Sequence, residues 1–151
     1  MNIKDILSLP NVIDVRAADK MKVLQELCRR AAAAVALPVE FVTQEVLKRE
    51  ELGSTGVGEG VAIPHARLAN IAKPFGILAR LRNPIDFDAV DGRLVDLVFL
   101  LLLPQSQPSD QLNVLACVAR KLRDPVAVSA MRAATDTAGL YRGMVEDVPS
   151  R

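Results

Sequence analysis

Residues Leu94 to Leu103 form a nearly unbroken apolar segment that is rich in leucine and valine. A run of this composition is typical of a strand that is buried on both faces of a sheet. Its longest wholly apolar part, Leu97 to Leu103, falls far short of the about 20 residues that a membrane-spanning helix needs. The segment therefore predicts the central strand of a sheet that is covered on both sides.

The surrounding segments predict an α/β (α+β) fold. Further strands are expected at Asn11 to Val15, Val61 to Ile63 and Phe75 to Arg82, with a turn at Asn83 and Pro84. Helices are expected at Asp19 to Leu37, Val39 to Glu51, Ser109 to Arg123, Pro125 to Ala133 and Asp136 to Val145. Because helices come first, then strands and then helices again, we predict a single domain, residues 1–151, with a small central mixed sheet flanked by helices. The pattern does not fix the strand order.

Composition and charge exclude several classes of function. The net charge of +1 gives no electrostatic case for binding nucleic acid, and one tyrosine with four phenylalanines offers little for bases to stack on. Cys28 and Cys117 lie far apart in stretches of helical periodicity, so we expect no disulfide. The N-terminus lacks the apolar core and cleavage site of a signal peptide, so we expect a cytoplasmic protein that is not inserted into a membrane.

Metal and nucleotide sites have weak support in the sequence. Two cysteines and one histidine cannot supply the usual four ligands of a structural zinc site. A magnesium site could be considered at four aspartates around the predicted turn, Asp86, Asp88, Asp91 and Asp96. Carboxylates at such positions are more often solvated, or accept backbone N–H groups, than bound to magnesium. The glycine-rich segment lacks both the Gly-Lys-Ser/Thr ending of a P-loop and the spacing of a dinucleotide fingerprint. We therefore predict no metal and no cofactor.

The stretch from Leu52 to Arg67 is the candidate site for covalent chemistry. It contains four of the eight glycines and the only histidine, His65, whose unperturbed pKa lies near neutrality. The glycines predict a shaped loop, and Pro64 stiffens the corner between an extended segment and His65. An imidazole at such a corner, beside free backbone N–H groups, is suited to meeting an anion. Taken by itself, however, a lone histidine is more often structural or solvated than catalytic.

Arg49 is the candidate cation next to this stretch. On a helical wheel it lies close to Val42 and Val46, on the core-facing or edge-facing side of the predicted helix, whereas Lys48 points elsewhere. A basic residue at that position either pairs with Glu45, one turn back, or serves a functional anion. Helix geometry leaves both interpretations open.

Two runs of residues suggest a family. Together they resemble the active-site signature of the fructose/mannitol-type enzyme IIA domains of the bacterial phosphoenolpyruvate-dependent phosphotransferase system. The first run is Leu52-Gly53-Ser54-Thr55-Gly56, and the second is Gly60-Val61-Ala62-Ile63-Pro64-His65. The resemblance continues through Asn83 to Gly92 and Val95 to Phe99 and covers nearly the whole chain, with a motif core at residues 49–123. The stand-alone nitrogen-regulatory branch is the most similar. The resemblance implies an enzyme IIA mannitol/fructose-type fold, a single α/β domain.

The resemblance also implies an activity and the roles of individual residues. His65 would accept a phosphoryl group from a small histidine phosphocarrier protein of the HPr or NPr type, which makes the chain a phosphotransferase with a regulatory output. Arg49 would stabilise the phosphate, a role that favours the functional interpretation of this arginine. Donors for the phosphate oxygens would come from the hydroxyls and backbone N–H groups of Ser54, Thr55 and Gly56.

One position departs from the family pattern. Members commonly carry a second active-site histidine near the start of the helix after the central strand, and this chain has no histidine between Asp110 and Asn113. We expect Gln111 to take its place, although an amide cannot carry a proton. Two alternatives remain open. One is a sugar-specific enzyme IIA that passes phosphate to the IIB component of a fructose/mannitol transporter, and the other is a regulatory module that binds target proteins with little transfer activity.

Overall fold

Two strands, β5 (Phe75–Ile85) and β6 (Val95–Pro104), form the centre of the sheet in the computed structural model. The structure describes residues 2–106 and 108–146, apart from the side chains of residues 108–111. The other strands are β1 (Val12–Val15), β2 (Gly56–Gly58), β3 (Val61–Ala62) and β4 (His65–Leu68). The helices are α1 (Lys20–Val35), α2 (Val39–Glu51), α3 (Pro108–Leu122), α4 (Pro125–Ala133) and α5 (Thr137–Val145), with short 3-10 helices at Ile3–Asp5 and Leu9–Asn11.

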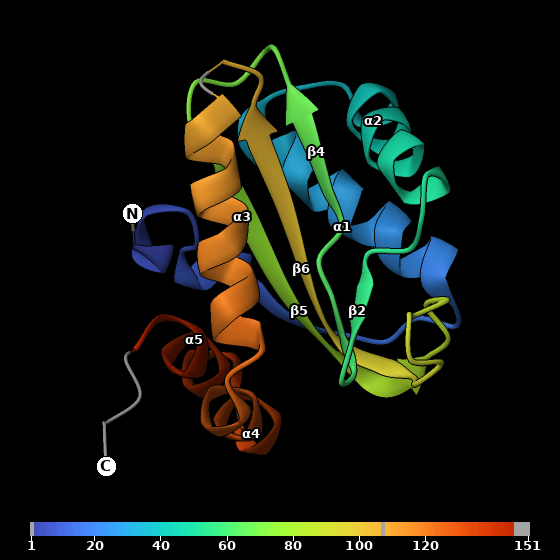
Figure 1. The fold of residues 1–151 in the computed structure, drawn as a ribbon, viewed down its shortest axis with the longest axis vertical. Coiled ribbons are helices and arrows are strands. Elements are labelled where there is room, and N and C mark those ends of the chain that lie inside the picture. Colours follow the sequence, from blue (N-terminus) through green and yellow to red (C-terminus); the bar gives the residue numbers. More distant parts are fainter. Residues whose placement is uncertain (1, 107, 147–151) are drawn as a thin grey trace.

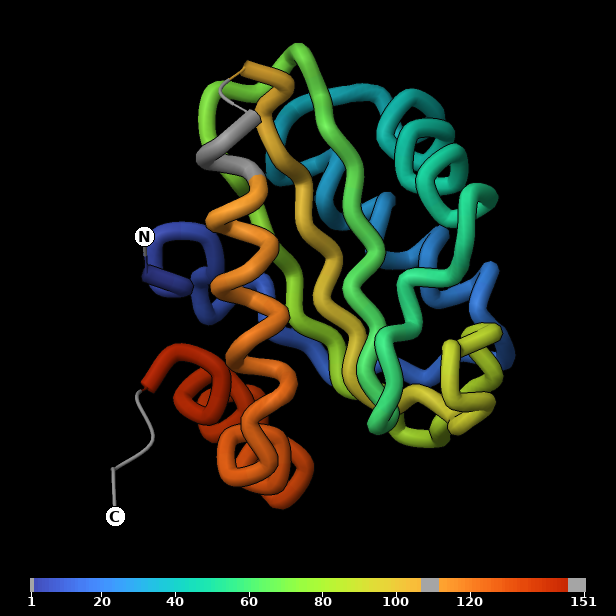
Figure 2. The backbone as a smooth tube through the Cα atoms, in the orientation of Figure 1, coloured from blue at the N-terminus to red at the C-terminus, as the bar shows by residue number. Residues whose placement is uncertain are grey.

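The sheet is mixed, as the element order predicts. Its strand order is β1-β5-β6-β3-β2, and β4 also pairs with β6. β5 runs antiparallel to β6, whereas β3 and β4 run parallel to it. β3 and β4 share one register along β6, with Val61 opposite Leu97 and His65 opposite Leu101. The chain from residue 61 to residue 68 therefore follows a single edge of the central strand, and β2 pairs with β3 outside it (Figure 2).

β6 is buried on both faces, which confirms the prediction from its composition. From Leu97 onward, side chains at odd-numbered positions, such as Leu97 and Phe99, belong to a core that includes residues of α3, α4 and α5. Side chains at even-numbered positions, such as Val98 and Leu100, belong to a second core that includes residues of α1 and α2. Figure 1 shows these two groups of helices on opposite sides of the strands. The alternation follows from the two-residue period of a strand.

β5 is longer than the sequence predicts. The strand continues through Asn83 and Pro84, where a turn was expected, and ends at Ile85. The pairing with β6 shifts between Arg80 and Ile85, and residues 82–84 are exposed there. A bulge of this kind tolerates a proline, because the missing N–H would not have been needed for the ladder. The turn signal was thus a local irregularity within a strand.

The glycine-rich stretch also contains more strand than a loop prediction allows. Three short strands, β2, β3 and β4, lie between Gly56 and Leu68, and His65 is the first residue of β4. Pro64 was expected to stiffen the corner before His65, and in the structure its carbonyl accepts a hydrogen bond of 2.9 Å from the Leu101 N–H. The position of His65 is therefore fixed by the backbone of the central strand.

The helices match their predicted ranges closely. α2 and α4 have the predicted bounds, while α1 ends at Val35 because Ala36 adopts a left-handed conformation, with a φ of 58°. α3 begins at Pro108, so Ser109 is inside the first turn. Neither Cys28 nor Cys117 forms a disulfide within the described part of the chain. Within residues 2–106 and 108–146, no helix is long and apolar enough to cross a membrane.

The start of α1 gives the first test. The Asp19 side chain accepts a hydrogen bond of 2.9 Å from the Lys22 N–H and caps the helix. We expect Asp19→Ala to lower the free energy of unfolding by about 1 kcal/mol, because the N–H loses its acceptor. Asp19→Asn should stay close to the unmodified protein, since an amide oxygen can accept the same bond. Urea denaturation measures both, and equal losses in the two variants would contradict the cap.

Candidate functional site

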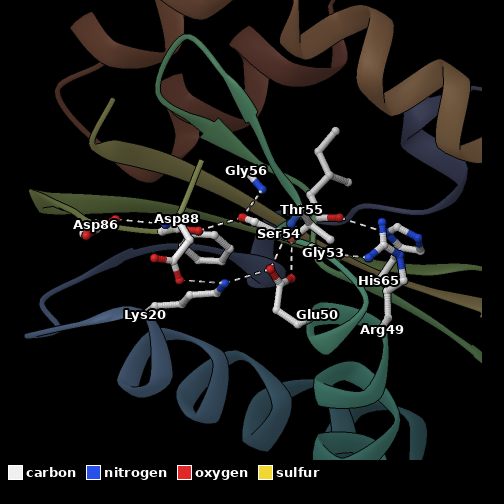
Figure 3. Close-up of polar contacts among 12 residues, drawn as sticks. Lys20, Arg49, Glu50, Gly53, Ser54, Thr55, Gly56, His65, Asp86 and Asp88 are labelled. Carbon is white, nitrogen blue, oxygen red and sulfur yellow. Dashed lines mark hydrogen bonds and ion pairs between the residues drawn. The ribbon is translucent and has the colours of Figure 1, made fainter. Parts of the chain in front are cut away.

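Segments that lie far apart in the sequence meet around His65. The C-terminal end of α2 provides Arg49 and Glu50, the following loop provides residues 53–56, and β4 provides the histidine (Figure 3). Residues 86–88, between β5 and β6, border the same loop. The site is thus assembled on the edge of the sheet where β3 and β4 pair with β6.

The imidazole of His65 is held in one tautomer. Its Nδ1 lies 2.9 Å from the Ile63 carbonyl oxygen. Since a carbonyl can only accept, this hydrogen bond requires the proton on Nδ1 and leaves a lone pair on Nε2 of the neutral ring. The contact also fixes the plane of the ring. A neutral imidazole with Nε2 unprotonated is a nucleophile.

Burial and nearby charges keep this ring neutral. Desolvation of the half-buried side chain is the largest effect and lowers the pKa of His65 below its usual value, and the positive charges of Arg49 and Arg67 lower it further. The hydrogen bond to Ile63 and the charge of Glu50 act in the opposite direction. Near neutral pH the ring is therefore unprotonated.

Arg49 lies beside the histidine, as Figure 3 shows. Its Nη1 donates a hydrogen bond of 2.8 Å to the carbonyl oxygen of Gly53, in the loop that follows α2. Glu45, the alternative partner that helix geometry left open, forms an ion pair of 3.1 Å with Lys48 instead. The half-buried guanidinium of Arg49 is thus placed where an anion on His65 would meet it.

Ser54, Thr55 and Gly56 hold the loop together. The Ser54 hydroxyl donates to the Phe87 carbonyl at 2.7 Å and accepts from the Gly56 N–H at 3.0 Å. Gly56 approaches Ala89 so closely that a Cβ would lie 2.9 Å from its atoms, which explains the need for glycine. The Thr55 side chain is buried and donates to Glu50 at 2.5 Å. Phosphate binding by these residues stays a prediction.

Glu50 and Lys20 are members of the site that sequence reasoning missed. Glu50 is 9% exposed and forms an ion pair of 2.9 Å with Lys20, whose Nζ also lies 3.5 Å from Asp88 and 4.8 Å from the centre of the Phe87 ring. The available signal was the spacing of four residues that places Glu50 on the buried side of α2, after Val42 and Val46.

The other residues that the sequence analysis considered are Gln111 and four aspartates. Gln111 belongs to α3, but its side chain is outside the described part of the structure. The four aspartates considered for magnesium have other contacts: Asp86 and Asp91 accept backbone N–H groups, Asp88 pairs with Lys20, and Asp96 pairs with Arg132. In the part of the chain that the structure describes, no group of three or more potential metal ligands occurs.

The charge balance around His65 can be tested by NMR. We expect the unphosphorylated protein to show the Nδ1–H tautomer and a His65 pKa below about 6.5. Arg49→Gln should raise this pKa, because a nearby positive charge disfavours the imidazolium, whereas Lys48→Gln should leave it unchanged. A pH titration of the ring nitrogens measures both, and an unchanged pKa in Arg49→Gln would contradict this account.

The same lowered pKa sets a sign for stability. The folded state binds its proton less readily than the unfolded chain, so stability rises with pH between the folded pKa of His65 and about 6.5. The stability that comes from keeping His65 unprotonated is fully present above about pH 6.5, and it is lost as the pH falls through the pKa of His65 in the folded protein.

Comparisons with known proteins find a matching family and several similar proteins. Residues 10–146 match the family described as phosphoenolpyruvate-dependent sugar phosphotransferase system, EIIA 2. A nitrogen regulatory protein of Bradyrhizobium diazoefficiens is 42% identical over 142 residues, which cover 93% of each chain. The crystal structure of nitrogen regulatory protein IIA-Ntr from Neisseria meningitidis aligns with a TM-score of 0.89 at 31% identity, and the alignment covers 94% of this chain and 98% of that one.

A more distant structure shares the fold alone. The crystal structure of IIA mannitol from Escherichia coli has a TM-score of 0.76 at 18% identity, over 91% of this chain and 98% of that chain. The predicted fold, a single α/β domain of the IIA mannitol/fructose type, is confirmed by both structures. The resemblance inferred from the glycine and histidine motifs is confirmed as well. The chain belongs to the EIIA 2 family of the phosphoenolpyruvate-dependent sugar phosphotransferase system.

Proposed function

We propose that this protein is a cytoplasmic phosphocarrier in which His65 receives a phosphoryl group from a small histidine phosphocarrier protein. The observation that carries the proposal is the hydrogen bond from Nδ1 to Ile63, which leaves the Nε2 lone pair for attack. The P–N bond of the donor breaks as a P–N bond to Nε2 forms, and the donor nitrogen keeps the electron pair. No proton has to move at His65 before attack, because the ring is already neutral.

Arg49 is the residue best placed to stabilise the transferred group. In a loose phosphoryl-transfer transition state the protein contributes mainly by positioning and charge neutralisation. If Arg49 donated to a phosphate oxygen in place of the Gly53 carbonyl oxygen, its guanidinium would gain a charge-assisted hydrogen bond. Ser54 and Thr55 can reach a phosphate only by giving up their acceptors at Phe87 and Glu50.

The other predicted contacts complete the proposal. Gly56 donates its N–H to Ser54, so it too would need to exchange its partner to bind phosphate. Gln111 takes the place of the second histidine of the family and orients the phosphate by hydrogen bonding alone. Because an amide cannot relay a proton, neither acceptance nor release of the phosphoryl group involves proton transfer at that position.

We propose a regulatory output in place of sugar transport. The support is the similarity, over 93% of both chains, to a protein named as a nitrogen regulatory protein. Phosphorylation adds about −1.5 to −2 charges at neutral pH, which is enough to change how a protein surface binds its targets. The alternatives are a sugar-specific enzyme IIA that supplies a IIB component, and a binding module with little transfer activity.

Intact mass spectrometry tests the phosphocarrier. After incubation with phosphoenolpyruvate, enzyme I and the phosphocarrier protein, we expect a gain of one acid-labile phosphate, which is absent in His65→Ala. Arg49→Gln should slow the gain by on the order of 10²-fold, because one stabilising group is lost in the transition state. Lys48→Gln serves as the control on the same helix and should keep the original rate.

The outcomes separate the three functions. A stable phosphorylated protein that keeps its phosphate when mixed with a fructose- or mannitol-type IIB domain supports the regulatory output. Rapid transfer to that domain would favour sugar transport. Failure to gain phosphate, in an assay that labels a related enzyme IIA, would overturn the phosphocarrier and leave the binding module.

A further inference from the structure

A continuous series of hydrogen bonds connects Glu50 with the imidazole of His65. The two carboxylate oxygens of Glu50 accept the N–H and the hydroxyl of Thr55, at 2.8 and 2.5 Å. The Thr55 carbonyl accepts the Ile63 N–H at 3.0 Å, and the Ile63 carbonyl accepts Nδ1–H of His65 at 2.9 Å. Each bond in the series fixes the residue that provides the next one.

The series is shielded from water. Glu50 is 9% exposed, and Thr55 and Ile63 are 3% exposed each. Water therefore cannot readily replace a lost partner, and a hydrogen bond in this environment is stronger than at the surface. Lys20 offsets the cost of burying the Glu50 charge, and its ammonium is covered in turn by the ring of Phe87.

We propose that Glu50 is a positioning residue for phosphoryl transfer: through Thr55 and Ile63 it sets the tautomer and orientation of His65. This inference rests on the proposed function, since it assigns a role in that reaction. The carboxylate does not touch the phosphoryl group. It determines where the Ile63 carbonyl lies, and that carbonyl determines which ring nitrogen carries the proton.

The charge of Glu50 contributes separately from its hydrogen bonds. The charged groups that act on the His65 ring are the cations Arg49 and Arg67 and the anion Glu50. The two cations disfavour the protonated imidazole, and Glu50 opposes them. A more basic ring nitrogen is a stronger nucleophile, so the carboxylate preserves the reactivity that the arginines would otherwise reduce.

Glu50→Gln separates the two contributions. A glutamine oxygen can still accept the Thr55 N–H, so the loop is retained while the charge is lost. We expect the His65 pKa to fall further and kcat for phosphoryl acceptance to decrease on the order of tenfold, with KM for the phosphocarrier protein unchanged. Glu50→Ala should also reduce the fraction of the Nδ1–H tautomer, because the Thr55 contacts are lost.

Two controls match the variant. Glu51→Gln removes a charge from the adjacent, exposed position of the same helix, and Asp88→Asn removes the other carboxylate near Lys20. Both should keep the pKa of His65 and kcat. If Glu50→Gln alone does not fold, the pair Lys20→Met and Glu50→Gln removes both buried charges together, and the same NMR titration is made on that protein.

The NMR and kinetic readouts distinguish the two proposals. A His65 pKa and kcat in Glu50→Gln equal to those in Glu51→Gln would overturn the positioning role. A shifted pKa and tautomer, in a protein whose unmodified form gains no phosphate, would overturn the proposed function but support the control of His65 by Glu50. A purely structural role would lower stability without moving the pKa, which also counts against the inference.

Discussion

Burial of β6 on both faces is the constraint on which the rest of the structure depends. A strand in that position cannot leave backbone groups unpaired, so both of its edges must be occupied. β5 pairs along one edge, and the short strands β3 and β4 share the other. Pairing along that second edge places His65 opposite Leu101, whose N–H donates to the Pro64 carbonyl. The demand of the core for a fully paired central strand therefore determines where the reactive side chain lies.

The break between β3 and β4 supplies the groups that the site uses. Pro64 stays at the edge of β6, where its carbonyl accepts the Leu101 N–H, while the backbone groups of Ile63 are used on the other side: the N–H binds the Thr55 carbonyl just before β2, and the carbonyl binds the His65 ring. If another strand paired with Ile63 on that side, the ladder would use this carbonyl, and it could not bind the His65 ring. Pro64 has no backbone N–H, so the break between the two strands leaves no donor at that residue that needs a partner.

Sequence reasoning predicted what depends on local pattern. The burial of β6, the bounds of α2 and the proximity of Arg49 to His65 follow from composition, helix period and motif. It missed what depends on tertiary pairing. The extension of β5 past Pro84 required knowledge of the bulge. The role of Glu50 required knowing that Thr55 and Lys20 approach it from outside α2, which no spacing within the helix records.

A phosphocarrier must hold its phosphoryl group and then release it, and the charges around His65 are suited to both. In the proposed reaction, the positive charges of Arg49 and Arg67 would favour an arriving phosphate, whose charge is about −1.5 to −2. The negative charge of Glu50 would limit that attraction, while the ion pair with Lys20 offsets the cost of burying the carboxylate. A site with cations alone would stabilise the phosphorylated histidine as much as the transition state, which slows the release. On the proposed function, the buried carboxylate would thus favour transfer of the phosphoryl group over its retention.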